Sequence, residues 1–368
     1  MGAANLTTST PAPSLGSYTG TSSPPPPPAL SGELARVRGD AGVHGNGVSD
    51  GRHVPDWQGE QFRLLDVARR LFPEDDRLQR CHRVRVSRAH PVTMHQRESG
   101  RLLFENVQTC GRLACPVCGA RIRVRRAQET KRLAAAAADL DYAVLRADWT
   151  YQHGAGDDLR ALLRLQDEAF RKLGSGKNAV SQRVRRVGGE FRGMRRADDY
   201  TFGQSGHHPH VHSVLFVRWA SVADVEGTLQ DAWGNATAAV GLRVGRNALQ
   251  VQEIDPSGAG YLFKPGNRTG KPVGGRYSAA QLLQEAAQGN VQAGQLWADY
   301  ARATMGRTST VTTPGLRNLV LERASLSDGQ DAQLSTYRKP DGAVLVADFG
   351  DWHGVNAAVL ASVAEKLA

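Results

Sequence analysis

Two histidines one residue apart, His210 and His212, are the clearest candidates for chemistry in this sequence. They lie in the run HHPHVHSVLFV, directly before the apolar stretch Val214 to Val217. Alternate side chains of a β-strand share a face, so both imidazoles would point toward one place. Neutral imidazole is the commonest metal-binding side chain, and such a pair needs an oxygen ligand to complete a divalent-metal site. The alternative is a histidine-rich strand end that makes ordinary hydrogen bonds.

An acidic ligand could come from the preceding strand. Residues 191–202 and 208–217 both have strand character, and the turn residues 204–206 between them predict an antiparallel hairpin. Asp198 and Asp199 would then lie beside the histidines. Strand alternation directs only one of these carboxylates toward the histidines, and the pattern leaves open which one.

A tyrosine and a lysine supply a nucleophile and a cation. Tyr261 and Lys264 are three residues apart, so on the helix expected there they share one face. A phenol with a pKa of about 10 needs a nearby cation, metal or base to react at neutral pH. Facing a His-His-carboxylate metal site, Tyr261 could attack a phosphodiester whose non-bridging oxygen the metal polarises. The alternative is a core aromatic beside Gly260.

The cysteines predict a structural zinc site. Cys81 stands alone, whereas Cys110, Cys115 and Cys118 lie in CGRLACPVC. A C-x-x-C pair with a third and a fourth cysteine provides four thiolates, which fits zinc better than a thioredoxin-like redox pair. Reduced, unligated thiols are the alternative, and His82 could replace one ligand.

A basic helix is predicted directly after the last cysteine. Its sequence, ARIRVRRAQETKRLAAAAADL, carries four arginines in its first half: Arg121, Arg123, Arg125 and Arg126. The whole chain of 368 residues has a formal net charge of +10. A basic protein of this kind favours an anionic partner, and nucleic acid is the first candidate. A solvated helix face is the alternative interpretation.

The elements that would hold these residues predict an α+β fold. Strands are expected at 142–151, 191–202, 208–217 and 248–254. Helices are expected at 61–72, at 159–173, around Leu229 and Trp233, and near Tyr261. The result is a central antiparallel sheet flanked by helices.

Composition divides the chain into four parts. Residues 1–57 form a tail rich in proline, serine and glycine, which is typical of disorder. Residues 58–138 form the cysteine-rich, basic segment, 139–275 the core with the sheet, and 276–368 a mainly helical region. No apolar run reaches about 18 residues, and the N-terminus lacks the pattern of a signal peptide. We therefore expect a cytoplasmic protein without membrane contact.

The motifs and their order resemble those of HUH endonucleases, especially the replication initiator (Rep) proteins of rolling-circle plasmids of the actinobacterial type. The run GQSGHHPHVHSVLF is similar to their motif G-x-x-G-W-H-P-H-x-H. Upstream and downstream motifs of the family are matched in order by CGRLACPVCGARIRVRRAQE, WTYQH, YLFK and LWADYARATMGRTSTVTTPGLR. The resemblance covers about residues 80–318.

The resemblance implies a ferredoxin/RRM-like core and assigns roles to five residues. His210 and His212 match the metal ligands, and Asp199 falls where relatives often have a glutamate ligand in E-x-T-x-G. The ion would be Mg²⁺ or Mn²⁺. Tyr261 matches the nucleophile and Lys264 its basic neighbour. The implied reaction nicks single-stranded plasmid origin DNA at an extruded hairpin, forming a 5′-phosphotyrosine and a 3′-hydroxyl for the host polymerase, with a host helicase as a further partner.

The sequence also departs from the family pattern. His207 replaces the usual tryptophan, and residues 147–148 disturb the T-L-T of the first strand motif. Ser257 lies where some relatives carry the glutamate thought to activate water at termination. That role is left to Glu253 or Asp255 as weak candidates.

Two functions of other classes stay open. The spacing of His208, His210 and His212 imitates the H-x-H-x-H of histidine-triad nucleotide hydrolases, in which a histidine forms the covalent intermediate, although Ser213 breaks the apolar spacing of that motif. A zinc-containing DNA-binding protein without catalysis is the other possibility. It predicts binding to duplex DNA with a steep salt dependence and no nicking.

Overall fold

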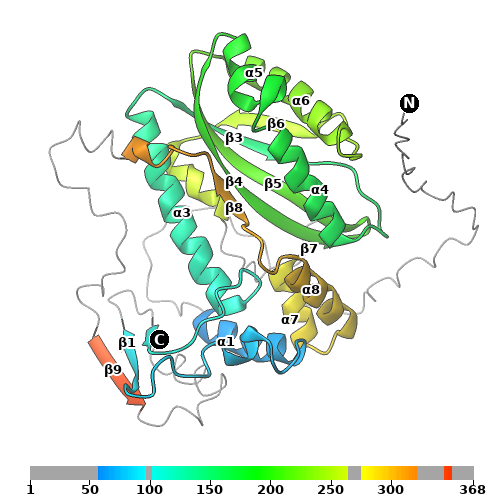
Figure 1. Ribbon diagram of the computed structural model, residues 1–368. Helices are drawn as coiled ribbons and strands as arrows, with labels where there is room; N and C mark the ends of the chain where they lie inside the picture. Colours follow the sequence, from blue (N-terminus) through cyan, green and yellow to red (C-terminus); the bar gives the residue numbers. More distant parts are fainter. Residues whose placement is uncertain (1–56, 97–101, 264–274, 321–343, 350–368) are drawn as a thin grey trace, which may run out of the picture. The chain divides into compact units, whose positions relative to one another are not determined.

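A six-stranded antiparallel sheet forms the core of the described structure (Figure 1). The computed structural model describes residues 57–96, 102–263, 275–320 and 344–349. The strands follow the order β6-β3-β5-β4-β7, and β8 pairs with a further stretch of β4. Their bounds are β3 (Ala143–Trp149), β4 (Glu190–Gly203), β5 (Gly206–Arg218), β6 (Leu249–Glu253), β7 (Tyr277–Ser278) and β8 (Thr310–Thr312). The expected α+β fold with an antiparallel sheet flanked by helices is confirmed.

The predicted hairpin is present as β4 and β5. The two strands meet at the turn 204–205, and their register pairs Asp199 with His210. Gly206 closes the turn with φ +80°, and a Cβ there would lie 2.8 Å from the Cα of Ala155. Glycine is therefore required at this position both by the backbone conformation and by the close approach.

Three helices pack on one face of the sheet (Figure 1). They are α4 (Leu159–Lys172), α5 (Val180–Arg186) and α6 (Val222–Ala238). Trp149 of β3 meets the rings of Phe170 and Trp233 edge-on, with ring centroids 5.5 and 5.4 Å away. Truncating such a buried tryptophan to alanine costs about 3–5 kcal/mol, so this cluster fixes the sheet against the helices. The predicted helices at 159–173 and around Leu229 are confirmed.

The opposite face of the sheet is covered by α3 (Pro116–Ala138) and the 3-10 helix η2 (Pro256–Phe263). Val144 and Phe216 of the sheet pack there against alanines of α3. The close packing of the two helices depends on Gly260, because a Cβ at that position would lie 3.2 Å from the carbonyl oxygen of Ala127. The histidines of β5 belong to this face.

The helix expected to carry both Tyr261 and Lys264 is present only in part. It is a 3-10 helix that ends at Phe263, and Lys264 lies outside the described residues. The sequence PSGAGYLF contains one proline and two glycines, which disfavour an α-helix. The eight-residue 3-10 helix is long for its type, since most 3-10 runs have three or four residues.

The cysteine-rich segment contains helices and a small sheet. Its elements are α1 (Trp57–Arg70), α2 (Arg77–Arg80), β1 (Val92–Gln96) and β2 (Leu102–Glu105), and β1 also pairs with β9 (Val344–Phe349). The helix predicted at 61–72 corresponds to α1. The predicted tail at 1–57 lies outside the described residues except for Trp57.

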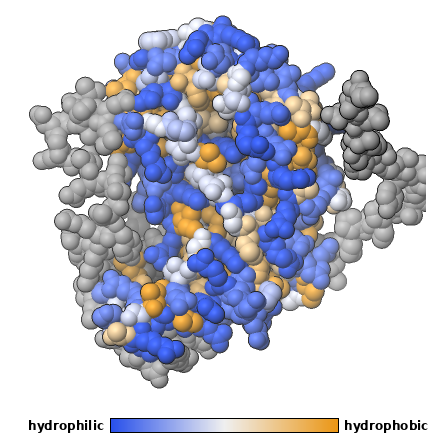
Figure 2. All heavy atoms as spheres, in the orientation of Figure 1, coloured by the Kyte–Doolittle hydropathy of each residue, from blue (hydrophilic) through white to orange (hydrophobic). Residues whose placement is uncertain are grey.

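The region after 276 contains both helices and strands. Its helices are α7 (Ala279–Ala287) and α8 (Val291–Ala303), and Gly289, with φ +95°, and the capping residue Asn290 separate them. Strands β7, β8 and β9 also belong to this region. No helix in the described ranges is long and apolar enough to cross a membrane. Figure 2 shows a face on which hydrophilic residues predominate and apolar residues form small separate patches.

Candidate functional site

Asp199, His210 and His212 come together on the neighbouring strands β4 and β5. Oδ2 of Asp199 lies 3.4 Å from Nε2 of His210 and 3.5 Å from Nε2 of His212. Two ligands bound at about 2.1 Å in tetrahedral directions are separated by about 3.4 Å, so this spacing suits a metal ion. The three residues form one of the two groups among the described residues that could hold a metal. Of the two aspartates left open by the sequence, Asp199 is the one beside the histidines.

The charges of this group favour a cation. The surrounding protein acts to raise the pKa of Asp199, but bonds to His210 and His212 hold that pKa well below its usual range. Burial acts to lower the pKa of His212, but its bonds to Asp148 and Asp199 raise that pKa above the ordinary value. Two carboxylates therefore increase the affinity of His212 for positive charge.

Asp148 on β3 is a site residue that the sequence did not identify. It lies opposite His212 in the register, and its carboxylate bonds to Nδ1 of that histidine. Arg146 holds the same carboxylate through two bonds of 3.0 and 2.6 Å. A carboxylate on Nδ1 fixes the ring orientation and leaves Nε2 to bind a metal. The available signal was its place on a strand expected to adjoin the histidine strand.

His208 is the third histidine on this face of β5, and it bonds to another histidine, whereas His210 and His212 lie beside a carboxylate. His153 Nδ1 lies 3.1 Å from the carbonyl oxygen of Ser205, which can only accept, so His153 carries its proton on Nδ1. His153 Nε2 then accepts from Nδ1 of His208 at 2.6 Å. Burial, together with the nearby His210 and His153, lowers the pKa of His208 to about 4. His208 is thus neutral at physiological pH and lies outside the Asp199 group.

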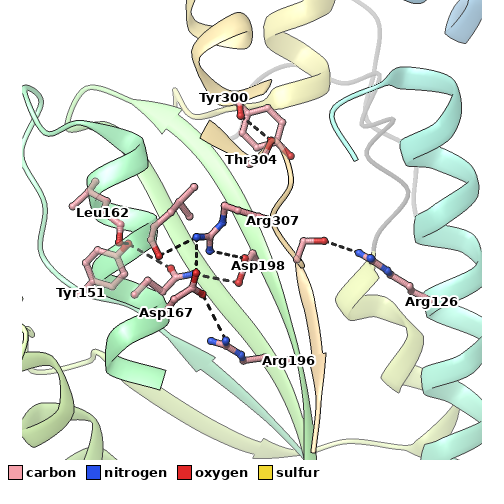
Figure 3. Close-up of polar contacts among 12 residues, drawn as sticks. Arg126, Tyr151, Leu162, Asp167, Arg196, Asp198, Tyr300, Thr304 and Arg307 are labelled. Carbon is pink, nitrogen blue, oxygen red and sulfur yellow. Dashed lines mark hydrogen bonds and ion pairs between the residues drawn. The ribbon is translucent and has the colours of Figure 1, made fainter. Parts of the chain in front are cut away.

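A cavity of about 760 Å³ is lined by basic residues and by the acidic and histidine side chains of the candidate site, namely Asp148, Asp199, His208, His210 and His212. Arg123 and Arg126 of α3 line it, and Arg276 contributes from the segment before β7. Arg126 reaches across to Ser309, with Nη1 2.6 Å from Oγ, as Figure 3 shows. A metal group and three guanidinium groups in one cavity provide binding partners for phosphate.

The four arginines predicted to bind DNA therefore separate into two pairs. Arg123 and Arg126 line the cavity. Arg125 is exposed and forms an ion pair of 2.9 Å with Glu129, and Arg121 lies close enough to His82 to lower its pKa. Neither of this second pair lines the cavity.

Tyr261 lies next to the site but is not part of the cavity lining. Its side chain is 52% exposed, and the guanidinium carbon of Arg146 lies 5.9 Å from its ring centroid. Arg146 bonds to Asp148, which bonds to His212, so two side chains connect Tyr261 to the candidate metal group. The structure thus brings Tyr261 near the histidines, whereas Lys264 lies outside the described residues.

Asp198 belongs to a separate network of ion pairs. Its Oδ2 lies 3.2 Å from Nη2 of Arg307, and Arg307 also bonds to Asp167 of α4 at 2.6 Å (Figure 3). Arg196 lies 3.6 Å from Asp167 and stacks on the ring of Phe170. The network joins β4, α4 and the segment between α8 and β8.

The four cysteines form the second group that could hold a metal. Sγ of Cys81 lies 3.5 Å from that of Cys118 and 3.8 Å from that of Cys115, and all four sulfurs are within 4.8 Å of one another. Cys115 caps α3 by accepting from the Cys118 amide at 3.4 Å. Burial raises the pKa of Cys115 well above the ordinary value. Four buried sulfurs at this spacing suit a zinc ion, which keeps thiolates deprotonated.

His82 is not a member of the cysteine group, so it does not replace a thiolate. Its ring packs edge-on against Phe62 and Phe104. Burial lowers its pKa to about 4. It is therefore a neutral core side chain.

The residues assigned from the sequence thus form two groups that could hold a metal, and two arginines line the cavity of the first. Comparison with protein-family models, with curated proteins and with solved structures finds no match to this chain.

Proposed function

We propose that this protein is a metal-dependent endonuclease that nicks single-stranded DNA and transfers the strand through a 5′-phosphotyrosine, as the resemblance to rolling-circle initiators of the HUH class implies. One observation carries the proposal: Asp199, His210 and His212 converge in a cavity that also contains Arg123 and Arg126. Three O and N ligands beside guanidinium groups suit the binding of a phosphodiester better than that of a neutral substrate.

The arrangement of the strands supports the same proposal. Strand β5, with the histidines, lies between β3 and β4 in an antiparallel sheet, and helices cover both faces. This is compatible with the ferredoxin/RRM-like core expected of the family. The zinc-type cysteine group next to α3 would hold the helix that presents Arg123 and Arg126.

Each residue has a role in the proposed reaction. A Mg²⁺ or Mn²⁺ ion on Asp199, His210 and His212 would polarise a non-bridging oxygen of the scissile phosphate. The oxygen of Tyr261 attacks phosphorus, the bond from phosphorus to the 3′ oxygen breaks, and the proton lost by the phenol balances the proton gained by the 3′-hydroxyl. Arg146, stacked on the ring of Tyr261, would stabilise negative charge on the phenol.

The experiment is a covalent-adduct assay. A fluorescent pool of single-stranded oligonucleotides of random sequence is incubated with the protein and Mn²⁺, and labelled protein is detected on a denaturing gel. We expect adducts with the wild type and none with Tyr261→Phe. Tyr300 also lines the cavity, so Tyr300→Phe is the matched control. Adducts that are retained by Tyr261→Phe and lost in Tyr300→Phe would show that Tyr300, and not Tyr261, is the nucleophile.

Absence of adducts with every divalent metal would refute the nickase. Duplex binding in that case would favour a DNA-binding protein without catalysis. Origin DNA of a plasmid, a host helicase and a host polymerase are the partners that the nickase implies, and the cytoplasm is the compartment.

A further inference from the structure

A second hollow lies at the outer edge of the sheet, beside the edge strand β6. It shares the lining residues Asp148, Asn247 and Gln250 with the cavity that contains the candidate metal group, so the two lie side by side. Four amide side chains line it, from Gln230, Asn247, Gln250 and Gln252. Asn247 and Gln250 therefore border both the cavity of the candidate metal group and this second hollow.

The strand register fixes where these amides lie. Asp148 of β3 pairs with His212 on one side and with Gln250 on the other, which places the three residues in one row across the sheet. Paired residues share a face, so Gln250 is on the face of the histidines. Neighbouring strands are about 4.8 Å apart, so Gln250 lies about 10 Å from His212. Gln252 pairs in the same way with Arg146, whose guanidinium stacks on Tyr261.

Among the described residues, two side chains that line this hollow are held by hydrogen bonds to the backbone, whereas three of its amide side chains are not. Gln230 Nε2 donates to the carbonyl oxygen of Arg246 at 2.7 Å, and a carboxylate oxygen of Glu226 accepts from the amide of Val251 at 2.9 Å. Among the described residues, the side chains of Asn247, Gln250 and Gln252 take part in no hydrogen bond. Each amide group therefore offers both a donor and an acceptor to a ligand.

We propose that this hollow reads one base of the bound strand, next to the scissile phosphate, through Asn247 and Gln250. The inference rests on the proposed single-stranded DNA substrate. A donor and an acceptor on one planar amide match the paired edge groups of a nucleobase, and a bidentate contact of this kind discriminates between bases by about 5- to 150-fold. Phosphates carry no sequence information, so contacts of the arginines of the first cavity with phosphate cannot supply this selectivity.

The test is a binding selection that does not depend on cleavage. Tyr261→Phe protein with Mn²⁺ is incubated with random single-stranded DNA, and the retained strands are sequenced. We expect a preference of about 5- to 150-fold at one position, which Gln250→Ala or Asn247→Ala flattens while preferences elsewhere remain. Gln182→Ala, an exposed glutamine of α5, is the matched control and keeps the preference.

The outcomes separate the two proposals. An unchanged preference in Gln250→Ala and in Asn247→Ala would overturn the base-reading hollow, as would equal flattening in Gln182→Ala. Retained strands with this pattern, together with no covalent adduct in the wild type, would support the hollow and refute the nickase. Failure to retain any single-stranded DNA would overturn both. Thermal unfolding of the variants is expected to match the parent, because the replaced amides are exposed.

Discussion

Asp198 and Asp199 are adjacent in sequence, but they belong to two different sets of contacts. Asp199 lies 3.4–3.5 Å from two histidine nitrogens, whereas Asp198 bonds to Arg307 and to Gln166. Replacing each in turn by asparagine changes the charge and keeps the shape. We predict that Asp199→Asn weakens metal binding with little change in stability, and that Asp198→Asn lowers stability with little change in metal binding.

The loss of metal affinity in Asp199→Asn can be estimated from the place of Asp199 as a direct ligand in the candidate metal group. Removal of a residue that only orients a ligand costs about 10- to 100-fold in metal affinity, so loss of a charged ligand costs at least about 100-fold. That factor corresponds to about 2.7 kcal/mol. The side chain is 48% exposed, so its effect on unfolding should stay within about 0.5 kcal/mol.

The loss of stability in Asp198→Asn follows from the charges of the ion-pair network to which Asp198 belongs. Asp198 and Asp167 balance Arg196 and Arg307, so the asparagine leaves one positive charge uncompensated. Asp198 is only 15% exposed, and bonds to charged groups contribute about 1.5–3 kcal/mol. Arg307 keeps its 2.6 Å bond to Asp167, and burial raises the pKa of Asp198, which offsets part of what its bonds contribute. The expected loss therefore lies at the lower end of that range, about 1.5 kcal/mol. For a folded part of this size the midpoint of unfolding falls by about 3–6 °C.

Both quantities can be measured on the same two proteins. Free Mn²⁺ is followed by its electron paramagnetic resonance signal during titration, because imidazole and carboxylate sites take Mn²⁺ whereas thiolates select zinc. Unfolding is followed by circular dichroism. If Asp198→Asn lost as much Mn²⁺ affinity as Asp199→Asn, or if Asp199→Asn bound Mn²⁺ like the wild type, the assignment of Asp199 as a ligand would be wrong.

Three further predictions concern the parts that support the site. Asp148→Asn should weaken Mn²⁺ binding by about 10- to 100-fold, since it removes the carboxylate that orients His212; the same titration measures it, and unchanged affinity would contradict an orienting role. Arg126→Ala should reduce the salt dependence of single-stranded DNA binding by about 0.7 in slope, as fluorescence anisotropy at several salt concentrations would detect, whereas the exposed Arg125→Ala should not; equal slopes for the two would argue against the cavity as the DNA site. Cys115→Ser should remove about one zinc ion per chain by elemental analysis and lower the midpoint of unfolding, and full zinc content in this variant would exclude the four-cysteine site.

Much of the sheet could be predicted because its pattern is local. The apolar stretch Val214 to Val217 marks β5, and the turn at 204–205 joins it to β4 without any distant contact. The pairing of β8 with β4 and of β9 with β1 joins segments far apart in the chain, for which a single sequence has no signal. The proline and the two glycines of η2 disfavour an α-helix, but they do not by themselves predict a 3-10 helix.

The metal group was partly predictable for the same reason. His210 and His212 share a face by strand alternation alone, but the choice between Asp198 and Asp199 requires the register of β4 on β5. Asp148 was interpreted as a disturbance of a strand motif, because its partner His212 is 64 residues away. Only the pairing of β3 with β5 gives that carboxylate a function.

Strand β8 also constrains when the site can be completed during synthesis. Ser309 and Thr310 line the cavity, and Thr313 donates to the carbonyl oxygen of Met194 across 119 residues of chain. Contacts between such distant segments form late, because the chain between them must first be made and ordered. A nascent chain on the ribosome therefore holds Asp199, His210 and His212 long before the wall opposite them exists. An interrupted chain that ends before β8 would carry Asp199, His210 and His212 without the residues of this segment that line the cavity.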